Sequence, residues 1–311
     1  DTGRSRKKWL VVFAVLGMCC TCGLILVGRN NWPLAGGIFI LGTVGYYGAF
    51  IVYNSLLPIV SPPKNRHFVS GLGFAMGYLG GVILFAASIA LVKNHAAFGL
   101  ATETQAVHIA FLAAAIWWLL FTLPLLFLVN EPSKDQPPTA MRTSLVHLGK
   151  TIREMASNRS LLLFLIAYWL YIDGVNTVVS MASNYGKTLG FSTSTMLGTL
   201  ILVQVVGVPS TLLVTYLAGR YRARPFLFAG IGLYLATVAY AAMMPTTPIQ
   251  LFGFSLSSLY VLGFLVGCAQ GGIQALSRST FSLLIPPERT ASYLGVYNML
   301  GQYAALLGPL M

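Results

Sequence analysis

A single carboxylate stands inside the apolar stretches of this sequence. Asp173 lies near the centre of residues 160–185. That stretch is long enough to cross a bilayer, because about 20 apolar residues at ~1.5 Å rise span a ~30 Å hydrocarbon core. A charge at that depth is costly, so the side chain is expected to face a protein interior or a water-filled cavity. We predict that Asp173 either carries a proton or forms a structural ion pair.

The neighbours of Asp173 form a polar stripe. Five residues follow helical spacing along one face, with Leu, Ile and Val around most of the remaining surface. Such a stripe either lines a water-filled cavity, which we favour, or is buried against another helix as a set of interhelical hydrogen bonds. The stripe consists of Asp173, Asn176, Thr177, Ser180 and Asn184.

A second polar stripe lies near the end of the chain, on an apolar stretch that begins at residue 249. It consists of Gln270, Gln274, Ser277 and Arg278. Three environments are open for the Arg278 guanidinium: it pairs with Asp173, it clamps an anion in a cavity, or it extends to lipid phosphate. If Arg278 pairs with Asp173, the carboxyl loses its role as a proton carrier.

The elements that position these residues are membrane helices. Hydrophobic residues make up 56% of the chain and charged ones 8%, which excludes a soluble domain and a disordered chain. All four cysteines lie in apolar stretches, and their cluster near residue 20 has no His or carboxylate beside it. We therefore expect no metal, no disulfide and no cofactor.

Nine spans can be counted, and the basic residues orient them. Fifteen Lys and Arg residues fall in loops on one side and three in loops on the other, which identifies the first side as cytoplasmic. The net charge of +12 thus reflects basic residues in cytoplasmic loops, where they lie next to anionic lipid headgroups. It implies no nucleic-acid partner. The predicted spans are Trp9–Gly28, Trp32–Leu57, Val69–Lys93, Gln105–Val129, Ser160–Tyr185, Thr193–Ala218, Pro225–Met244, Ile249–Leu276 and Tyr293–Met311.

One cytoplasmic loop is much longer than the rest. Residues 130–159 join a bundle formed by residues 1–129 to a second formed by residues 160–311, and we interpret the loop mainly as a linker. Within it, residues 141–155 are predicted to form an amphipathic helix at the membrane surface.

An internal repeat relates the two halves. The sequence from Tyr53 matches that from Ser277 at a constant offset, so that Pro62–Pro63 aligns with Pro286–Pro287 and Gly71 with Gly295. Parallel repeats around a central loop predict an all-α membrane protein with the major facilitator fold of two pseudo-symmetric six-helix bundles. Nine helices would then be present, two spans being absent before the chain begins and one after it ends. The offset places Tyr46, Phe50, Tyr53 and Asn54 at the positions equivalent to the second stripe.

Glycines recur at helix-crossing spacing in two parts of the chain. Gly263, Gly267 and Gly271 are four residues apart, and Gly71, Gly77 and Gly81 lie in the first copy of the repeat. Such positions let helices approach closely. We predict that they are sites of close helix packing.

The motifs resemble one branch of a known superfamily. The residues that carry the likeness are DGVNTVVSMASNYG, LVQ at 202–204, QGGIQALSRSTFSLLIPPE, YNMLGQYAALLGP, YNSLLP and SGLGFAMGYLGG. Together they resemble the vacuole-effluxer-like branch of the major facilitator superfamily, whose fungal members are associated with amino-acid efflux from the vacuole. The resemblance covers nearly the whole chain.

The resemblance implies where a site and a latch would lie. In the superfamily the first, fourth, seventh and tenth helices line a central cavity, which here would contain both polar stripes and the aromatic group at 46–54. A basic loop also latches the cytoplasmic ends of neighbouring helices. The residues matching that latch are Asp1, Arg4, Arg6, Arg220 and Arg222.

We therefore expect a secondary active transporter that works by alternating access. Its partners would be the bilayer, a small solute such as an amino acid, and protons, and we expect a monomer in a bacterial cytoplasmic membrane or, alternatively, a fungal vacuolar membrane. An enzyme is disfavoured, because aspartyl chemistry needs two embedded carboxylates and one is present. The alternative function is a non-transporting sensor or receptor built on a transporter scaffold.

Overall fold

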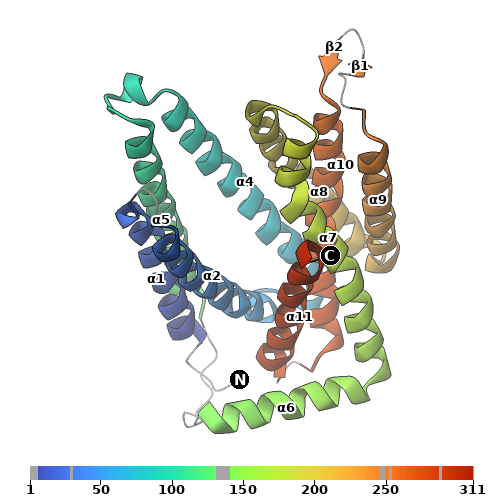
Figure 1. Cartoon of the computed structure of the whole chain (residues 1–311). Coiled ribbons are helices and arrows are strands. Elements are labelled where there is room, and N and C mark those ends of the chain that lie inside the picture. Colours follow the sequence, from blue (N-terminus) through green and yellow to red (C-terminus); the bar gives the residue numbers. More distant parts are fainter. Residues whose placement is uncertain are drawn as a thin grey trace. The chain divides into compact units, whose positions relative to one another are not determined.

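The computed structural model describes residues 6–28, 31–130, 141–245, 249–251, 254–286 and 289–310. Within them the chain is almost entirely helical (Figure 1). The helices are α1 (Arg6–Gly23), α2 (Trp32–Ser55), α3 (Leu57–Val60), α4 (Arg66–Lys93), α5 (Glu103–Leu128), α6 (Met141–Ser157), α7 (Arg159–Thr188), α8 (Thr193–Arg220), α9 (Ala223–Met243), α10 (Ser258–Leu284) and α11 (Thr290–Leu310). Short 3-10 turns occupy Leu24–Leu26, Pro63–Asn65 and His95–Phe98.

Eight helical segments in the described residues are long and apolar enough to cross a membrane. They correspond to the first eight predicted spans, and the ninth coincides with α11, a helix of 21 residues. Large apolar side chains such as Leu170, Phe228 and Leu235 are more than 60% exposed, as lipid-facing residues are. The all-helical membrane fold predicted from hydropathy is therefore confirmed. The predicted amphipathic segment also forms a helix, α6.

The start of the eighth predicted span is wrong. Residues assigned to its first turns form a short antiparallel hairpin, β1 (Ile249–Leu251) paired with β2 (Phe254–Leu256), with Ile249 opposite Leu256. The helix begins later, at Ser258, after Ser257 caps its first turn, and it continues to Leu284. Hydropathy averages over a window, so an apolar hairpin next to an apolar helix is read as one span.

The contacts divide the chain into two compact units. Unit 1 contains Asp1–Val60, Ile83–Leu148 and Glu288–Gly295, and unit 2 contains Ser61–Val82, Gly149–Pro287 and Val296–Met311. The start of α4 therefore belongs to unit 2, and the start of α11 to unit 1. These two segments are matching copies of the internal repeat. In both copies, the start of the helix is assigned to a different unit from the rest of the helix. The predicted division into bundles at 1–129 and 160–311 stays a prediction.

In unit 2, α10 is the central helix and packs on α7, α8 and α9. Glycines on α10 lie against β-branched side chains of α8: Thr199 packs on Gly263, and a Cβ added at Gly271 would collide with Thr211 Oγ1. Gly71 of α4 receives Thr215 of α8 in the same way. The predicted close packing is thus confirmed at these glycines, whereas a Cβ added at Gly77 would meet nothing within 4 Å.

In unit 1, α1 packs on both α2 and α5. Basic residues at the start of α1 reach the carboxyl-terminal ends of these two helices, where backbone carbonyls lack intrahelical partners. Arg6 Nη1 donates to Ser55 O at 3.3 Å, and Lys7 Nζ donates to Leu126 O at 2.8 Å. Cations at helix carboxyl termini also interact favourably with the helix dipole. The basic residues of this segment therefore fasten helix ends.

Candidate functional site

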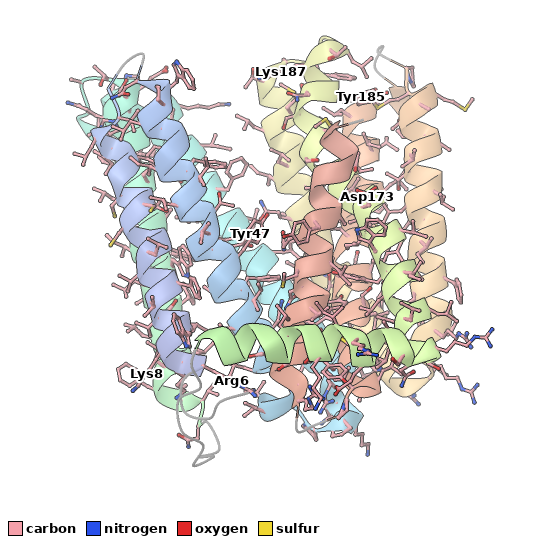
Figure 2. All side chains as sticks on the ribbon, turned by 60° about the horizontal axis from the view of Figure 1, so that its bottom comes forward. Arg6, Lys8, Tyr47, Asp173, Tyr185 and Lys187 are labelled. Atoms are coloured by element: carbon pink, nitrogen blue, oxygen red, sulfur yellow. The ribbon has the colours of Figure 1, made fainter. Side chains whose placement is uncertain are left out.

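Asp173 lies near the middle of α7, with Tyr185 and Lys187 closer to the end of that helix (Figure 2). Its Oδ1 atom is buried and makes no hydrogen bond with any described residue. A buried carboxylate oxygen without a donor is costly, since it has lost water and gained no replacement. Within the described chain, no hydrogen-bond donor offsets that cost at Oδ1.

Three other residues of the α7 stripe are bonded within the protein through their side chains. Asn176 Nδ2 donates to Gly301 O of α11 at 3.1 Å, which makes it an interhelical hydrogen bond. Thr177 Oγ1 donates to Asp173 O at 2.8 Å, and Ser180 Oγ donates to Thr177 O at 3.2 Å, both along their own helix. The two interpretations of the stripe thus apply to different residues: Asn176 bonds to a neighbouring helix, while Asp173 retains a free oxygen.

Two glutamines of the second stripe, Gln270 and Gln274, are half-buried on α10. Neither makes a side-chain hydrogen bond with the described residues. Ser277, one turn further on, lies 2.5 Å from Tyr171 Oη of α7, and its hydroxyl also donates to Ile273 O. Since that hydroxyl has one hydrogen, Tyr171 donates to Ser277. This bond fixes α7 against α10 close to Asp173.

Aromatic rings fill the space beside this bond. Tyr168 of α7 stacks on Tyr297 of α11 with centroids 4.1 Å apart, and Tyr297 stacks on Phe281 of α10 at 4.8 Å. Tyr171 packs edge-on against Tyr168. These contacts hold three helices around the segment of α7 that precedes Asp173, so the carboxylate is positioned by a rigid support.

Arg278 is bonded to α4, and two of the environments considered for it, an ion pair with Asp173 and an extension to lipid phosphate, are not observed in the described chain; the third, an anion clamp, stays a prediction. It is 4% exposed, which rules out a side chain extended to lipid phosphate in this structure. Its Nε donates to Ser70 Oγ at 3.0 Å, Nη2 donates to Ser70 O at 2.9 Å, and the guanidinium lies over the Phe74 ring. No salt bridge joins it to Asp173 in the described chain. The sequence could not supply this partner, because Ser70 is 208 residues away.

The contact between α4 and α10 contains further polar residues that sequence reasoning missed. Ser70 Oγ donates to Ala275 O at 2.8 Å, His67 Nδ1 lies 2.8 Å from Ser279 Oγ, and Arg66 Nη1 donates to Ser282 O at 3.0 Å. We call this set of contacts the α4–α10 seam; it comprises Arg66, His67, Ser70, Arg278, Ser279 and Ser282. The sequence signal for this contact was Arg66, a basic residue just after the Pro-Pro turn. It was interpreted as one of the basic residues of a cytoplasmic loop.

The four equivalent residues of α2 lie in unit 1. Tyr46 is 52% exposed and Tyr53 is 38% exposed, while Asn54 is buried. Tyr46 stacks on Phe50 with centroids 6.1 Å apart and meets Trp118 of α5 edge-on. An exposed aromatic surface on α2 is thus present as expected, and its place in a pathway stays a prediction.

Of the predicted latch, Arg6 binds the end of α2 as described above. Arg220 and Arg222 are exposed at the turn between α8 and α9. Asp1 and Arg4 lie outside the described residues. Figure 2 shows Arg6 and Lys8 at the start of α1.

Solved structures with the same arrangement of helices are transporters. A crystal structure of the proton:xylose symporter XylE bound to 6-bromo-6-deoxy-D-glucose matches with a TM-score of 0.65 at 18% identity, over 100% of this chain and 74% of that one. The E. coli fucose:proton symporter FucP matches with a TM-score of 0.64 at 15% identity, over 99% and 75%. At such identity the likeness shows the fold, which is that of the major facilitator superfamily of secondary transporters.

The sequence comparison identifies the family within that class. Residues 1–68 and 61–311 match the family model described as "Vacuole effluxer Atg22 like", so the chain belongs to that family. An uncharacterized MFS-type transporter, YxiO of Bacillus subtilis, is 34% identical over 98% of this chain and 70% of its own length. Autophagy-related protein 22 of Vanderwaltozyma polyspora is 23% identical over 100% of this chain and 66% of its own length. The protein is therefore an integral membrane transporter of the major facilitator type.

Proposed function

We propose that this protein moves a small amphipathic solute by alternating access and couples that movement to protons through Asp173. The proposal is carried by one observation: Oδ1 of Asp173 is buried on α7 and has no hydrogen-bond donor among the described residues. An ionisable side chain inside a membrane span is by default a candidate for a functional role, and Arg278 is bonded to Ser70 of α4.

The support around Asp173 suits a coupling site. The Tyr171–Ser277 and Asn176–Gly301 bonds fix α7 against α10 and α11 on either side of the carboxyl. Protonation of Asp173 would therefore change a charge at a fixed place, without requiring a loop to reorganise. We propose that the half-buried amides of Gln270 and Gln274 contact the solute.

The solute class is proposed from chemistry and family together. Amides, hydroxyls and tyrosines on the candidate helices suit a small molecule with both polar and apolar parts better than an inorganic ion. The family description names vacuolar effluxers, and the resemblance implies amino acids. We propose amino acids as the solute, a monomer as the working form, and a bacterial cytoplasmic membrane as the location.

The test is the substitution Asp173→Asn in the full-length protein reconstituted in liposomes. Asn keeps the size and hydrogen-bonding capacity of the side chain and removes the titratable proton. We expect uphill uptake of a radiolabelled amino-acid mixture to be lost and its pH dependence to flatten, while downhill exchange is retained. Uphill transport and pH dependence equal to the wild type would overturn the proton role of Asp173.

A matched control comes from the same helix. Ser180→Ala removes a polar group of the stripe that is exposed and bonded to its own helix. We expect this variant to transport as the wild type does. If both variants lost uphill transport equally, the stripe would act through its general polarity, and the specific role of Asp173 would be wrong.

A further inference from the structure

The α4–α10 seam contains a histidine whose protonation state can be read from its contacts. His67 Nδ1 lies 2.8 Å from Ser279 Oγ. The Ser279 hydroxyl donates its own hydrogen to Ala275 O of the preceding turn at 2.8 Å. Because a serine hydroxyl has one hydrogen, Ser279 accepts from His67, and Nδ1 carries the proton. In the closed seam Nε2 is thus the nitrogen left to take up a second proton.

The surroundings of His67 are basic. Arg66 precedes it on α4, and Arg278 of α10 binds Ser70 one turn further along α4. Both arginines are more than nine-tenths buried. Arg66 donates to two neutral backbone carbonyls, Ser282 O and Ser61 O. Lys64, three residues before His67, is exposed and also basic.

Carboxylates of unit 2 do not compensate this charge at His67. Among the described residues the unit contains Glu154 on α6 and Asp173 on α7, and neither hydrogen-bonds to the imidazole. A proton on Nε2 would therefore place a third positive charge beside two guanidinium groups in a poorly screened contact. The closed seam favours the neutral imidazole, whereas a separated seam, open to water, accepts the cation.

We propose that His67 is a proton-sensitive contact, and that its protonation separates the start of α4 from α10. The geometry supports this proposal because the seam residues that join the two helices include both His67 and the two arginines that would repel its cation. The device is independent of Asp173 and of the solute: it regulates when the seam opens. An experiment that contradicts the role of His67 would therefore leave the proposed coupling role of Asp173 untouched, and the reverse also holds.

The experiment measures the seam directly. Spin labels are attached at Asn65→Cys and Leu284→Cys, which are exposed on either side of the seam, in a full-length variant whose native cysteines are replaced by alanine. Distances are recorded in phosphatidylcholine vesicles between about pH 8 and about pH 5, the range in which histidine ordinarily titrates. We expect the ratio of separated to closed seams to rise about tenfold on acidification.

Two substitutions decide whether His67 is the sensor. His67→Asn keeps an N–H donor near the position of Nδ1 and cannot gain a charge, so its distance distribution should stay closed across the pH range. His108→Asn on α5, in unit 1, is the matched control and should respond as the wild type does.

The proposal is overturned by either of two results. One is a wild-type seam whose distances do not change with pH. The other is a His67→Asn variant that separates on acidification as much as the wild type does. If His67→Asn does not fold, His67→Gln takes its place, with the same expected result and the same two overturning outcomes.

Discussion

Two polar regions of unit 2 differ in how many hydrogen bonds their groups make between helices. In the α4–α10 seam, Ser70 both donates and accepts, and Arg278 has two bonds to it. Arg66 adds two bonds to backbone carbonyls, although its Nε has no partner among the described residues. On α7, Asp173 keeps a buried Oδ1 without a partner among the described residues. Both regions lie in helices that are otherwise apolar. Polar groups bonded between helices hold those helices together, whereas a buried oxygen without a donor costs stability. The seam should therefore respond to substitution mainly in stability, and Asp173 mainly in transport.

The largest expected effect on stability comes from Ser70→Ala. The change removes the donor to Ala275 O and leaves Arg278 Nε without the Ser70 hydroxyl as acceptor, at a fully buried position. Removing one partner of a buried hydrogen bond to a charged group costs about 2–3 kcal/mol. Thermal unfolding of the full-length protein in detergent should show a clearly lower midpoint. Ser88→Ala in the same helix, where the hydroxyl bonds to Leu84 O, is the control and should change it little.

A smaller loss is expected from Arg66→Ala. Arg66 donates to Ser282 O near the end of α10 and to Ser61 O after α3, so it caps two helix ends. Loss of charged donors at a helix carboxyl terminus costs about 1–2 kcal/mol. The unfolding midpoint should fall by less than in Ser70→Ala. Arg222→Ala, which removes an exposed guanidinium, should leave the midpoint unchanged, and an equal fall in both variants would contradict a capping role.

A still smaller effect is expected from Asn176→Leu. This substitution removes the interhelical bond to Gly301 O but leaves a carbonyl that is already used within its helix. Measured interhelical bonds in membrane proteins average about 0.6 kcal/mol. We expect a slight fall in the midpoint together with normal transport. Loss of transport at unchanged stability would show that Asn176, like Asp173, acts in transport. The assignment of Asn176 to a structural role would then be wrong.

The smallest effect on stability, and the opposite sign, is expected from Asp173→Leu. Replacing a partly buried side chain whose Oδ1 lacks a hydrogen-bond donor among the described residues removes a desolvation cost, so stability should stay the same or rise by about 1 kcal/mol. Unfolding midpoints of Asp173→Leu and wild type, measured side by side, test this. A large fall in the midpoint would show that Asp173 holds the fold together, and the comparison between the two regions would then fail.

Much of the fold could be predicted from the sequence. Apolar length located the membrane helices, and the internal repeat predicted the major facilitator fold. The hairpin at residues 249–256 was missed because hydropathy reports how apolar a segment is and not its backbone geometry. Asp173 was found because a carboxylate inside an apolar span is rare, a property of the sequence that needs no neighbour to be recognised.

The partners of the polar groups were decided by the tertiary structure alone. Helical periodicity shows which residues share a face, but it does not say which helix that face meets. Arg278 was expected near Asp173, in a cavity as an anion clamp, or at a headgroup, and it binds Ser70, 208 residues earlier in the chain. His67 showed no feature in the sequence, and it acquires a possible role only because α10 places Ser279 and Arg278 beside the start of α4. Composition and spacing thus determined the class of protein and its exceptional carboxylate, while the packing of distant helices determined which charges are satisfied.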